Sequence, residues 1–408
     1  MHPRTQFRVA LLAVATSFLT GCADGGEEDR PLSEVRFSAT HHLYGFRALR
    51  GFGTFPVPTT AVFTDQGTLN LFDDGTYTVA RSSGTSTAAR YALENPGDLA
   101  LFVPGANSEP SVVFRGAYGR VGAADLTVPG STPDLFFTDR VSTPASQSLG
   151  LYVGTRILTG QVELEGAWHL LSLHVVFGQT LLSPDNVARG ARGGVMVTAG
   201  APGTARTISG TGSQGTGGLV FGGTIQNLLT NGSGDGTCNL TVSYQLTGQP
   251  ADSRVVQAAA TNNLVLGLDA DESDGESGLV FLVRKFDAPA TPVDSVRVPG
   301  TFLVGGSTMF VNPTNSGSDA FVGTAVLTAP NGFRLDAVGN DGQDFSYQGT
   351  YTLAPDGGLT INVSGTNETW FAAIDRSYNT LVFVDDFLEV RSNNIPELNL
   401  GFGVRQKS

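Results

Sequence analysis

Short runs in which apolar and polar residues alternate, separated by turn residues, make up most of the chain after residue 36. Alternation with a period of two is typical of antiparallel β-strands, and the 3.6-residue period of amphipathic helices is missing. Near the C-terminus eight such runs predict strands at 299–311, 320–328, 332–337, 343–353, 358–363, 368–373, 379–388 and 397–405. The hydrophobic pattern therefore predicts an all-β protein.

One strand pair recurs three times along the chain. Each copy consists of an apolar strand, an acidic or polar loop and a second apolar strand that ends in arginine, and the copies span 133–156, 263–284 and 379–405. Upstream of these pairs, the residues at 91–103 are similar to those at 351–363. Repetition of this kind indicates separate structural units.

The repeats predict three β units at 36–158, 163–286 and 295–408, with a linker at 287–294 that contains proline and alanine. Eight antiparallel strands suffice to close a small barrel, and closure removes the exposed edges through which tandem sheets would stick together. We therefore expect three tandem antiparallel eight-stranded barrels, with eight-stranded β-sandwiches as the alternative. A unit of about 115 residues can bury its own core, so a fragment beginning near residue 290 is expected to fold alone.

The first 21 residues have the pattern of a secretory signal peptide, because arginines precede an apolar stretch at 9–19 that is shorter than the ~20 residues of a membrane span. The sequence Leu19-Thr20-Gly21-Cys22 resembles the bacterial lipobox, whose cysteine becomes the acylated first residue of a lipoprotein. The resemblance implies palmitate-type acylation of Cys22, a polar tether at 22–35 and stable membrane attachment. Ala23 is not the aspartate that retains enterobacterial lipoproteins in the inner membrane, so the resemblance implies the outer membrane, at its periplasmic face or at the cell surface.

Each unit has an aromatic residue near its start and an arginine at its end. The pairs are Tyr44 with Arg156, Trp168 with Arg284, and Phe302 with Arg405, and Gly166 and Gly300 stand two residues before the second and third aromatic residues. This arrangement resembles that of the lipocalins and other calycins, in which the final arginine packs over the ring of a Gly-x-Trp motif and closes the barrel base. The resemblance implies a structural role for these six residues, with a ring–guanidinium contact contributing ~0.5–2 kcal/mol.

The chain is acidic, with a net charge of −13. Because basic patches supply most non-specific affinity for phosphate backbones, nucleic acid is excluded as a partner. After Cys22 the only other cysteine is Cys238, so we expect no internal disulfide and stability that comes from apolar cores.

The sequence contains no motif of nucleophilic, phosphate-binding or zinc-dependent catalysis. His169 and His174 fall on opposite faces of one predicted strand and cannot chelate one ion. An acidic loop with Asp269, Asp271 and Asp274 is a weak calcium candidate, because its glycine comes one residue too late for a calcium loop. A solvated hairpin tip is the favoured interpretation of these charges.

These features predict a non-catalytic cell-envelope lipoprotein, without a cofactor, that has a structural, adhesive or protein-interaction role. Its expected partners are the membrane, through the lipid anchor, and an envelope protein or surface. Large side chains at alternating strand positions, namely Ile361, Phe371, Leu381 and Phe383, favour filled barrels. The alternative is a carrier that holds small apolar molecules inside its barrels.

Overall fold

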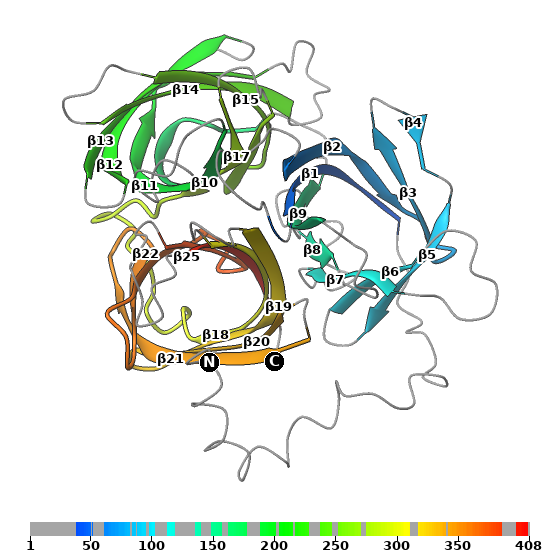
Figure 1. The fold of residues 1–408 in the computed structure, drawn as a ribbon. Coiled ribbons are helices and arrows are strands. Elements are labelled where there is room, and N and C mark those ends of the chain that lie inside the picture. The colour runs from blue at the N-terminus through cyan, green and yellow to red at the C-terminus, as the bar shows by residue number, and fades with distance from the viewer. Residues whose placement is uncertain are drawn as a thin grey trace.

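The computed structural model consists of β-strands, β1 to β25, with no α-helix among the residues that it describes (Figure 1). These residues are 38–49, 51, 61–81, 84–86, 88–94, 98–102, 112–118, 135–139, 148–156, 162–177, 188–200, 204–214, 217–227, 237–246, 252–270, 275–310, 317–339, 342–385 and 397–406. The predicted signal peptide, Cys22 and the tether lie outside them. A search of these same residues for a helix able to cross a bilayer finds none.

The first nine strands form barrel 1. They are β1 (Ala39–Leu49), β2 (Val62–Leu71), β3 (Thr76–Arg81), β4 (Gly84–Thr85), β5 (Ala89–Glu94), β6 (Asp98–Phe102), β7 (Val112–Tyr118), β8 (Leu135–Asp139) and β9 (Ser148–Arg156). The sheet order is β2-β1-β9-β8-β7-β6-β5-β3-β4, and an additional pairing of β2 with β3 brings eight of the strands into a ring. The two-residue strand β4 is attached to β3 outside that ring.

Two further closed barrels follow, each with eight antiparallel strands in sequence order. Barrel 2 contains β10 (Gly166–Val176), β11 (Ala188–Val197), β12 (Ala205–Gln214), β13 (Gly217–Asn227), β14 (Thr237–Leu246), β15 (Asp252–Ala260), β16 (Leu264–Asp269) and β17 (Glu276–Arg284). Barrel 3 contains β18 (Gly300–Phe310), β19 (Gly317–Thr328), β20 (Gly332–Gly339), β21 (Asp344–Leu353), β22 (Gly358–Val363), β23 (Thr369–Ile374), β24 (Thr380–Val384) and β25 (Glu397–Arg405). The all-β prediction of eight-stranded barrels is confirmed, and the sandwich alternative is wrong because the first and last strands pair in barrels 2 and 3.

Each barrel encloses its own apolar cluster, because every second residue of a strand points inward. In barrel 3 the interior includes Phe302, Phe321, Phe333, Trp370 and Phe383, all buried. Barrels 1 and 2 have separate interior clusters built in the same way. Ile361, Leu381 and Phe383 occupy the interior as expected, whereas Phe371 packs on the outside of barrel 3 against the core between barrels.

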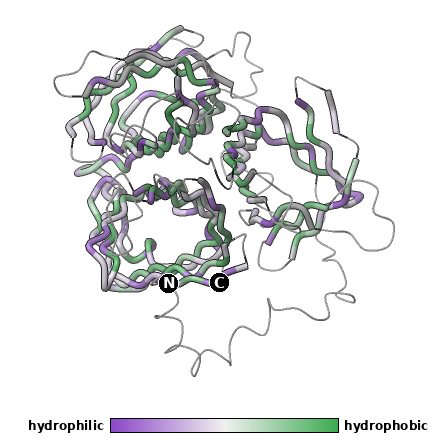
Figure 2. The backbone as a smooth tube through the Cα atoms, in the orientation of Figure 1, coloured by the Kyte–Doolittle hydropathy of each residue, from purple (hydrophilic) through white to green (hydrophobic). Residues whose placement is uncertain are grey.

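A fourth cluster lies between the barrels and contains residues from all three, at the centre of the arrangement in Figure 1. Most of it comes from the outward faces of the first, seventh and eighth strands of each ring, namely β1, β8 and β9, then β10, β16 and β17, then β18, β24 and β25. In these strands both faces are buried, and apolar stretches from all three barrels meet where the barrels approach one another (Figure 2). A fragment that begins near residue 290 would therefore expose the large apolar face that barrel 3 contributes to this cluster. The expectation that the fragment folds alone did not take this face into account.

Residues 287–294, expected to form a linker, pack against barrel 3. Asp287 forms an ion pair with Arg376, the Val293 amide donates to the Pro355 carbonyl, and the Asp294 amide donates to the Tyr378 hydroxyl at 2.8 Å. The connection between barrels 2 and 3 is thus fixed in place.

Candidate functional site

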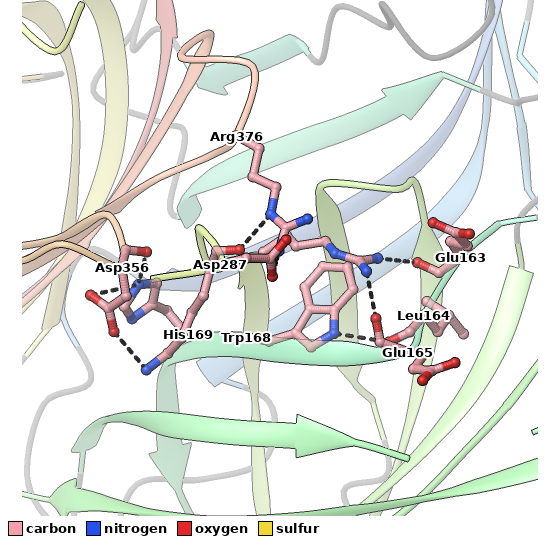
Figure 3. A network of polar contacts seen from close by, with 10 residues as sticks. Glu163, Leu164, Glu165, Trp168, His169, Asp287, Asp356 and Arg376 are labelled. Carbon is pink, nitrogen blue, oxygen red and sulfur yellow. Dashed lines mark hydrogen bonds and ion pairs between the residues drawn. The ribbon is translucent and has the colours of Figure 1, made fainter. Parts of the chain in front are cut away.

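The base of barrel 2, defined as the end at which Arg284 lies, is closed by Trp168 and Arg284. The two residues are direct partners in the β10–β17 register, and the guanidinium carbon lies 5.2 Å from the centroid of the indole. The fully buried indole donates from Nε1 to the Leu164 carbonyl at 2.9 Å. Arg284 donates to the carbonyls of Glu163 and Glu165, so ring and guanidinium together hold the segment before β10 across the base (Figure 3).

The base of barrel 3 repeats this arrangement. Phe302 pairs with Arg405 in the β18–β25 register, and the guanidinium carbon lies 4.8 Å from the ring centroid. Arg405 donates to the carbonyls of Arg297, Val298 and Tyr378, and also to that of Pro299. Burial lowers the pKa of both Arg284 and Arg405, because taking a cation partly out of water disfavours its charged form.

The glycine two residues before each ring has a steric reason to be there. A Cβ at Gly300 would lie 2.6 Å from Nη1 of Arg405, and one at Gly166 would lie 3.3 Å from Nη2 of Arg284. Gly166 also has a positive φ of 121°, a conformation that residues with a side chain rarely adopt. The Gly-x-aromatic pattern therefore makes room for the arginine.

In barrel 1 the strand register does not pair Tyr44 with Arg156. Arg156 is opposite His41, while Tyr44 is opposite Val153 and packs in the core between barrels. His41, fully buried and 5.6 Å from the ring of Tyr118, therefore occupies the position of Trp168 and Phe302. The number of residues between His41 and Arg156 is similar to the number between Trp168 and Arg284. This spacing is the sequence signal that would have identified His41 as the first-strand residue of barrel 1.

A polar network joins the base of barrel 2 to barrel 3 (Figure 3). Nε2 of His169, on the outer face of β10, lies 3.1 Å from the Asp356 carbonyl and 3.6 Å from its carboxylate. Lys285 forms an ion pair with the same carboxylate at 2.9 Å. Arg376 binds the Lys285 carbonyl and Asp287 at the same junction.

Titration in this network follows from its burial. Burial, followed by the charge of Lys285, lowers the pKa of His169 to about 4, so the imidazole is neutral at pH 7. Burial alone would raise the pKa of Asp356, but the hydrogen bond from Lys285 and the nearby charges outweigh it and lower that pKa. A neutral donor and a paired carboxylate make this junction a structural contact.

The end of a barrel opposite its base is here called its mouth, and the mouth of barrel 2 is polar inside. In barrel 2, Nε2 of His174 lies 3.7 Å from the fully buried Asp269 carboxylate, and Arg189 forms an ion pair with Glu276 at 2.5 Å. Ser172 faces the same interior, but its hydroxyl has no hydrogen bond to the imidazole. These side chains form a polar plug of the mouth, in which Arg189 is paired with Glu276.

Of the three residues of the weak calcium candidate, the structure describes only Asp269. Asp269 is the inward-facing end of β16 and contacts His174, while Asp271 and Asp274 lie outside the described residues. Within the part of the chain that the structure describes, no three acidic, histidine or cysteine side chains are grouped so as to hold a metal ion.

The outer wall of barrel 2, defined as the outward-facing side chains of β11 to β15, is exposed and uncharged over its middle strands. Thr207, Thr224 and Thr241 are direct neighbours across three strands, and Val255 continues the row. Other exposed members, all uncharged, are Met196, Ser209, Thr211, Val220, Gln226, Gln245 and Gln257. In a chain with a net charge of −13, a wall of hydroxyls and methyl groups is a distinct surface.

No known protein family matches the sequence, and no curated protein matches it. Solved structures of transferrin binding protein B are similar at low level. A single-site mutant from Haemophilus parasuis Hp5 is 8% identical with a TM-score of 0.32, the match covering 93% of this chain and 77% of that one. For isotype 1 from serogroup B Neisseria meningitidis the values are 8%, 0.25, 90% and 75%. With TM-scores below 0.5, these likenesses carry no argument about sites or partners.

Proposed function

We propose that this chain is a non-catalytic lipoprotein of the outer membrane, anchored through Cys22, that binds an envelope protein or surface through the outer walls of its barrels. The observation that carries the proposal is the exposed, uncharged outer wall of barrel 2. The closed ladders of barrels 2 and 3 offer no free strand edge to a partner, so recognition there has to use side chains on the walls. The acidic chain remains unsuited to nucleic acid.

The interior contents support walls rather than interiors as the working surface. Barrel 2 is filled by Trp168, Leu170, Phe221, Leu240 and Leu282, with its base closed by Arg284 and its mouth by the polar plug. The core between barrels holds the walls in fixed positions relative to one another. Rigid presentation lowers the entropy that a binding protein loses when its partner docks.

The anchor is tested by metabolic labelling with palmitate in cells that express the full chain. The wild type is expected to be labelled and membrane-bound, and Cys22→Ala is expected to lose both properties. Label that persists in Cys22→Ala would contradict lipidation at this residue.

The wall is tested in intact cells with a photo-activatable amino acid at Val220 or Thr224, and at Thr350 on the exposed wall of barrel 3 as the matched control. Cross-links to another envelope component are expected from the barrel 2 positions. Their absence there, or equal yields at Thr350, would argue against the outer wall of barrel 2 as the binding surface.

A further inference from the structure

The three barrels lie side by side and point the same way (Figure 1). At the base end, His169 of barrel 2 contacts Asp356, which lies in the turn between β21 and β22 at the base of barrel 3. At the mouth end, the hydroxyl of Ser318, near the start of β19, donates to the carbonyls of Ala48 and Leu49, at the end of β1. Because base meets base and mouth meets mouth, the bases of the barrels share one side of the molecule, here called the base face.

The described strands start at the base face. Ala39, the first residue of β1, lies two residues before His41, whose register partner is the final arginine of barrel 1, Arg156. Residues 23–38 connect this point to Cys22, and even fully extended they reach at most about 55 Å, at ~3.5 Å per residue. Passing from base to mouth along a barrel would use ~30 Å of that reach, the length of a ten-residue strand such as β2. A lipid on Cys22 therefore brings the base face to the membrane more readily than the mouths.

Barrel 3 presents small apolar side chains on the base face. They come from three connections that lie there, namely β17 to β18, β19 to β20 and β21 to β22, all of which belong to the described residues. Each connection contains an exposed Ala-Pro pair. The group, here called the apolar cap, consists of Ala288, Pro289, Ala290, Ala329, Pro330, Ala354 and Pro355. Side chains of this kind lose no hydrogen bonds to water when they approach the surface of a bilayer.

Val296 extends the cap and stands on a turn that is held in place. Its exposed fraction of 83% is the highest among the exposed large apolar side chains of the described residues. Its amide donates to Oδ1 of Asp294 at 3.0 Å, and the Asp294 amide donates to the Tyr378 hydroxyl. On the other side of the turn, the guanidinium carbon of Arg297 lies 4.1 Å from the centroid of the Tyr378 ring. The turn therefore keeps an apolar side chain exposed on a backbone that is fixed to barrel 3.

The charged side chains beside the cap are paired. Asp287 forms an ion pair with Arg376, and Lys285 forms one with Asp356 at 2.9 Å. Such pairs carry no net charge, so lipid phosphates do not repel them. The chain as a whole has a net charge of −13, which favours zwitterionic over anionic head groups as its neighbours.

We propose that the base face lies against the membrane, with the apolar cap and Val296 in contact with the head groups of zwitterionic phospholipids. The inference rests on the anchor at Cys22 in the proposed function, and it adds which face of the molecule the membrane covers. With the base face covered, the mouths point away from the membrane. The outer wall of barrel 2 then stays accessible to a partner.

The test uses the full-length, lipidated protein in cells whose phospholipids carry phosphorus-32. A photo-activatable amino acid is placed at Val296 or Pro289, and at Gln343 as the matched control, an exposed residue in the β20–β21 turn at the mouth of barrel 3. Phosphate label is used because acyl chains on Cys22 contain no phosphorus. Irradiation is expected to attach the label to protein with the probe at Val296 or Pro289 and not at Gln343. All three positions are exposed, and thermal melts establish that each variant has folded.

Purified lipidated protein in vesicles tests the head group. Cross-linking from Val296 to lipid is expected to be about twofold weaker in phosphatidylglycerol vesicles than in phosphatidylcholine vesicles at low ionic strength. Equal or stronger cross-linking in phosphatidylglycerol would contradict the preference for zwitterionic head groups.

The outcomes separate this inference from the anchor itself. Equal label at Gln343 and Val296, or no label at Val296 in protein that still incorporates palmitate, would overturn the orientation and leave the anchor standing. Cross-links from Val296 to a protein in place of lipid would overturn it in favour of a protein-docking surface. Failure of the wild type to incorporate palmitate would remove the anchor and the orientation together. None of these results bears on the outer wall of barrel 2, which the probes at Val220 and Thr224 test.

Discussion

Phe402 connects all three barrels, and its loss offers a direct test of the core between them. The residue is on β25, faces away from the interior of barrel 3 and is fully buried. Its ring stacks with Phe281 of barrel 2 at 5.8 Å and meets the edge of Phe136 of barrel 1 at 6.3 Å. The packing at Phe136 is close, since a Cβ at Gly305 would lie 2.5 Å from that ring.

The expected cost of Phe402→Ala follows from these contacts. Truncation of a buried phenylalanine costs about 3–5 kcal/mol through lost burial and the cavity that remains. Each aromatic pair contributes about 0.5–1.5 kcal/mol of favourable geometry, so two pairs place roughly 1–3 kcal/mol of the loss in contacts between barrels. The substitution should therefore lower the stability of barrels 2 and 3 together.

The assay uses the only two tryptophans, Trp168 in barrel 2 and Trp370 in barrel 3. In Trp370→Phe and Trp168→Phe backgrounds, urea unfolding followed by fluorescence reports each barrel in turn. Phe402→Ala is expected to lower both midpoints, and Phe72→Ala, at a phenylalanine that is 39% exposed, is the control with little effect. A shift confined to the Trp370 signal, or a loss below about 1 kcal/mol, would refute a shared core that couples the barrels.

Two further predictions concern the base of barrel 2 and its junction with barrel 3. Trp168→Ala should cost about 3–5 kcal/mol, and its coupling with Arg284→Ala in a double-mutant cycle should exceed ~0.5 kcal/mol, so strict additivity would remove the closure argument. The pKa of His169 falls from 6.5 to about 4 on folding. The folded state therefore binds fewer protons, and stability is complete above pH 6.5 and declines as the pH falls toward 4, by up to about 3 kcal/mol. His169→Gln should flatten the dependence of urea midpoints on pH in that window, whereas Asp356 and its lowered pKa act only at still lower pH.

Much of the fold was available from the sequence because alternation and repetition are local signals. The eight runs predicted in the third unit correspond to β18 to β25, with ends that differ by a few residues. The similarity of 91–103 to 351–363 also has a structural basis, because Tyr91 is on β5 and Tyr351 on β21, each the fourth strand of its ring. Period-two patterns report which face is apolar, and that is enough to place strands.

The contacts between barrels were not predicted, although a sign of them was present. Leu279 to Val283 on β17 are apolar at consecutive positions, which indicates a strand buried on both faces. That sign does not say which distant strand covers the second face, because the covering residues come from other units. The junction of His169 with Asp356 was missed for the same reason, since the two residues are far apart in sequence and neither stands in a motif.

The way the three barrels pack restricts where they can differ. The outward faces of the first, seventh and eighth strands are occupied by the common core, and in barrels 2 and 3 the base is occupied by the ring–arginine closure. What remains is the mouth and the wall of the intervening strands, and there barrels 2 and 3 diverge. Arg189 gives way to Asp319 at the mouth, and the uncharged row through Thr224 contrasts with the charged pair Arg334 and Asp336 on the wall of barrel 3. Barrels 2 and 3 therefore differ at surfaces that packing leaves unconstrained, and the photo-cross-linking experiment addresses one of these surfaces, the outer wall of barrel 2.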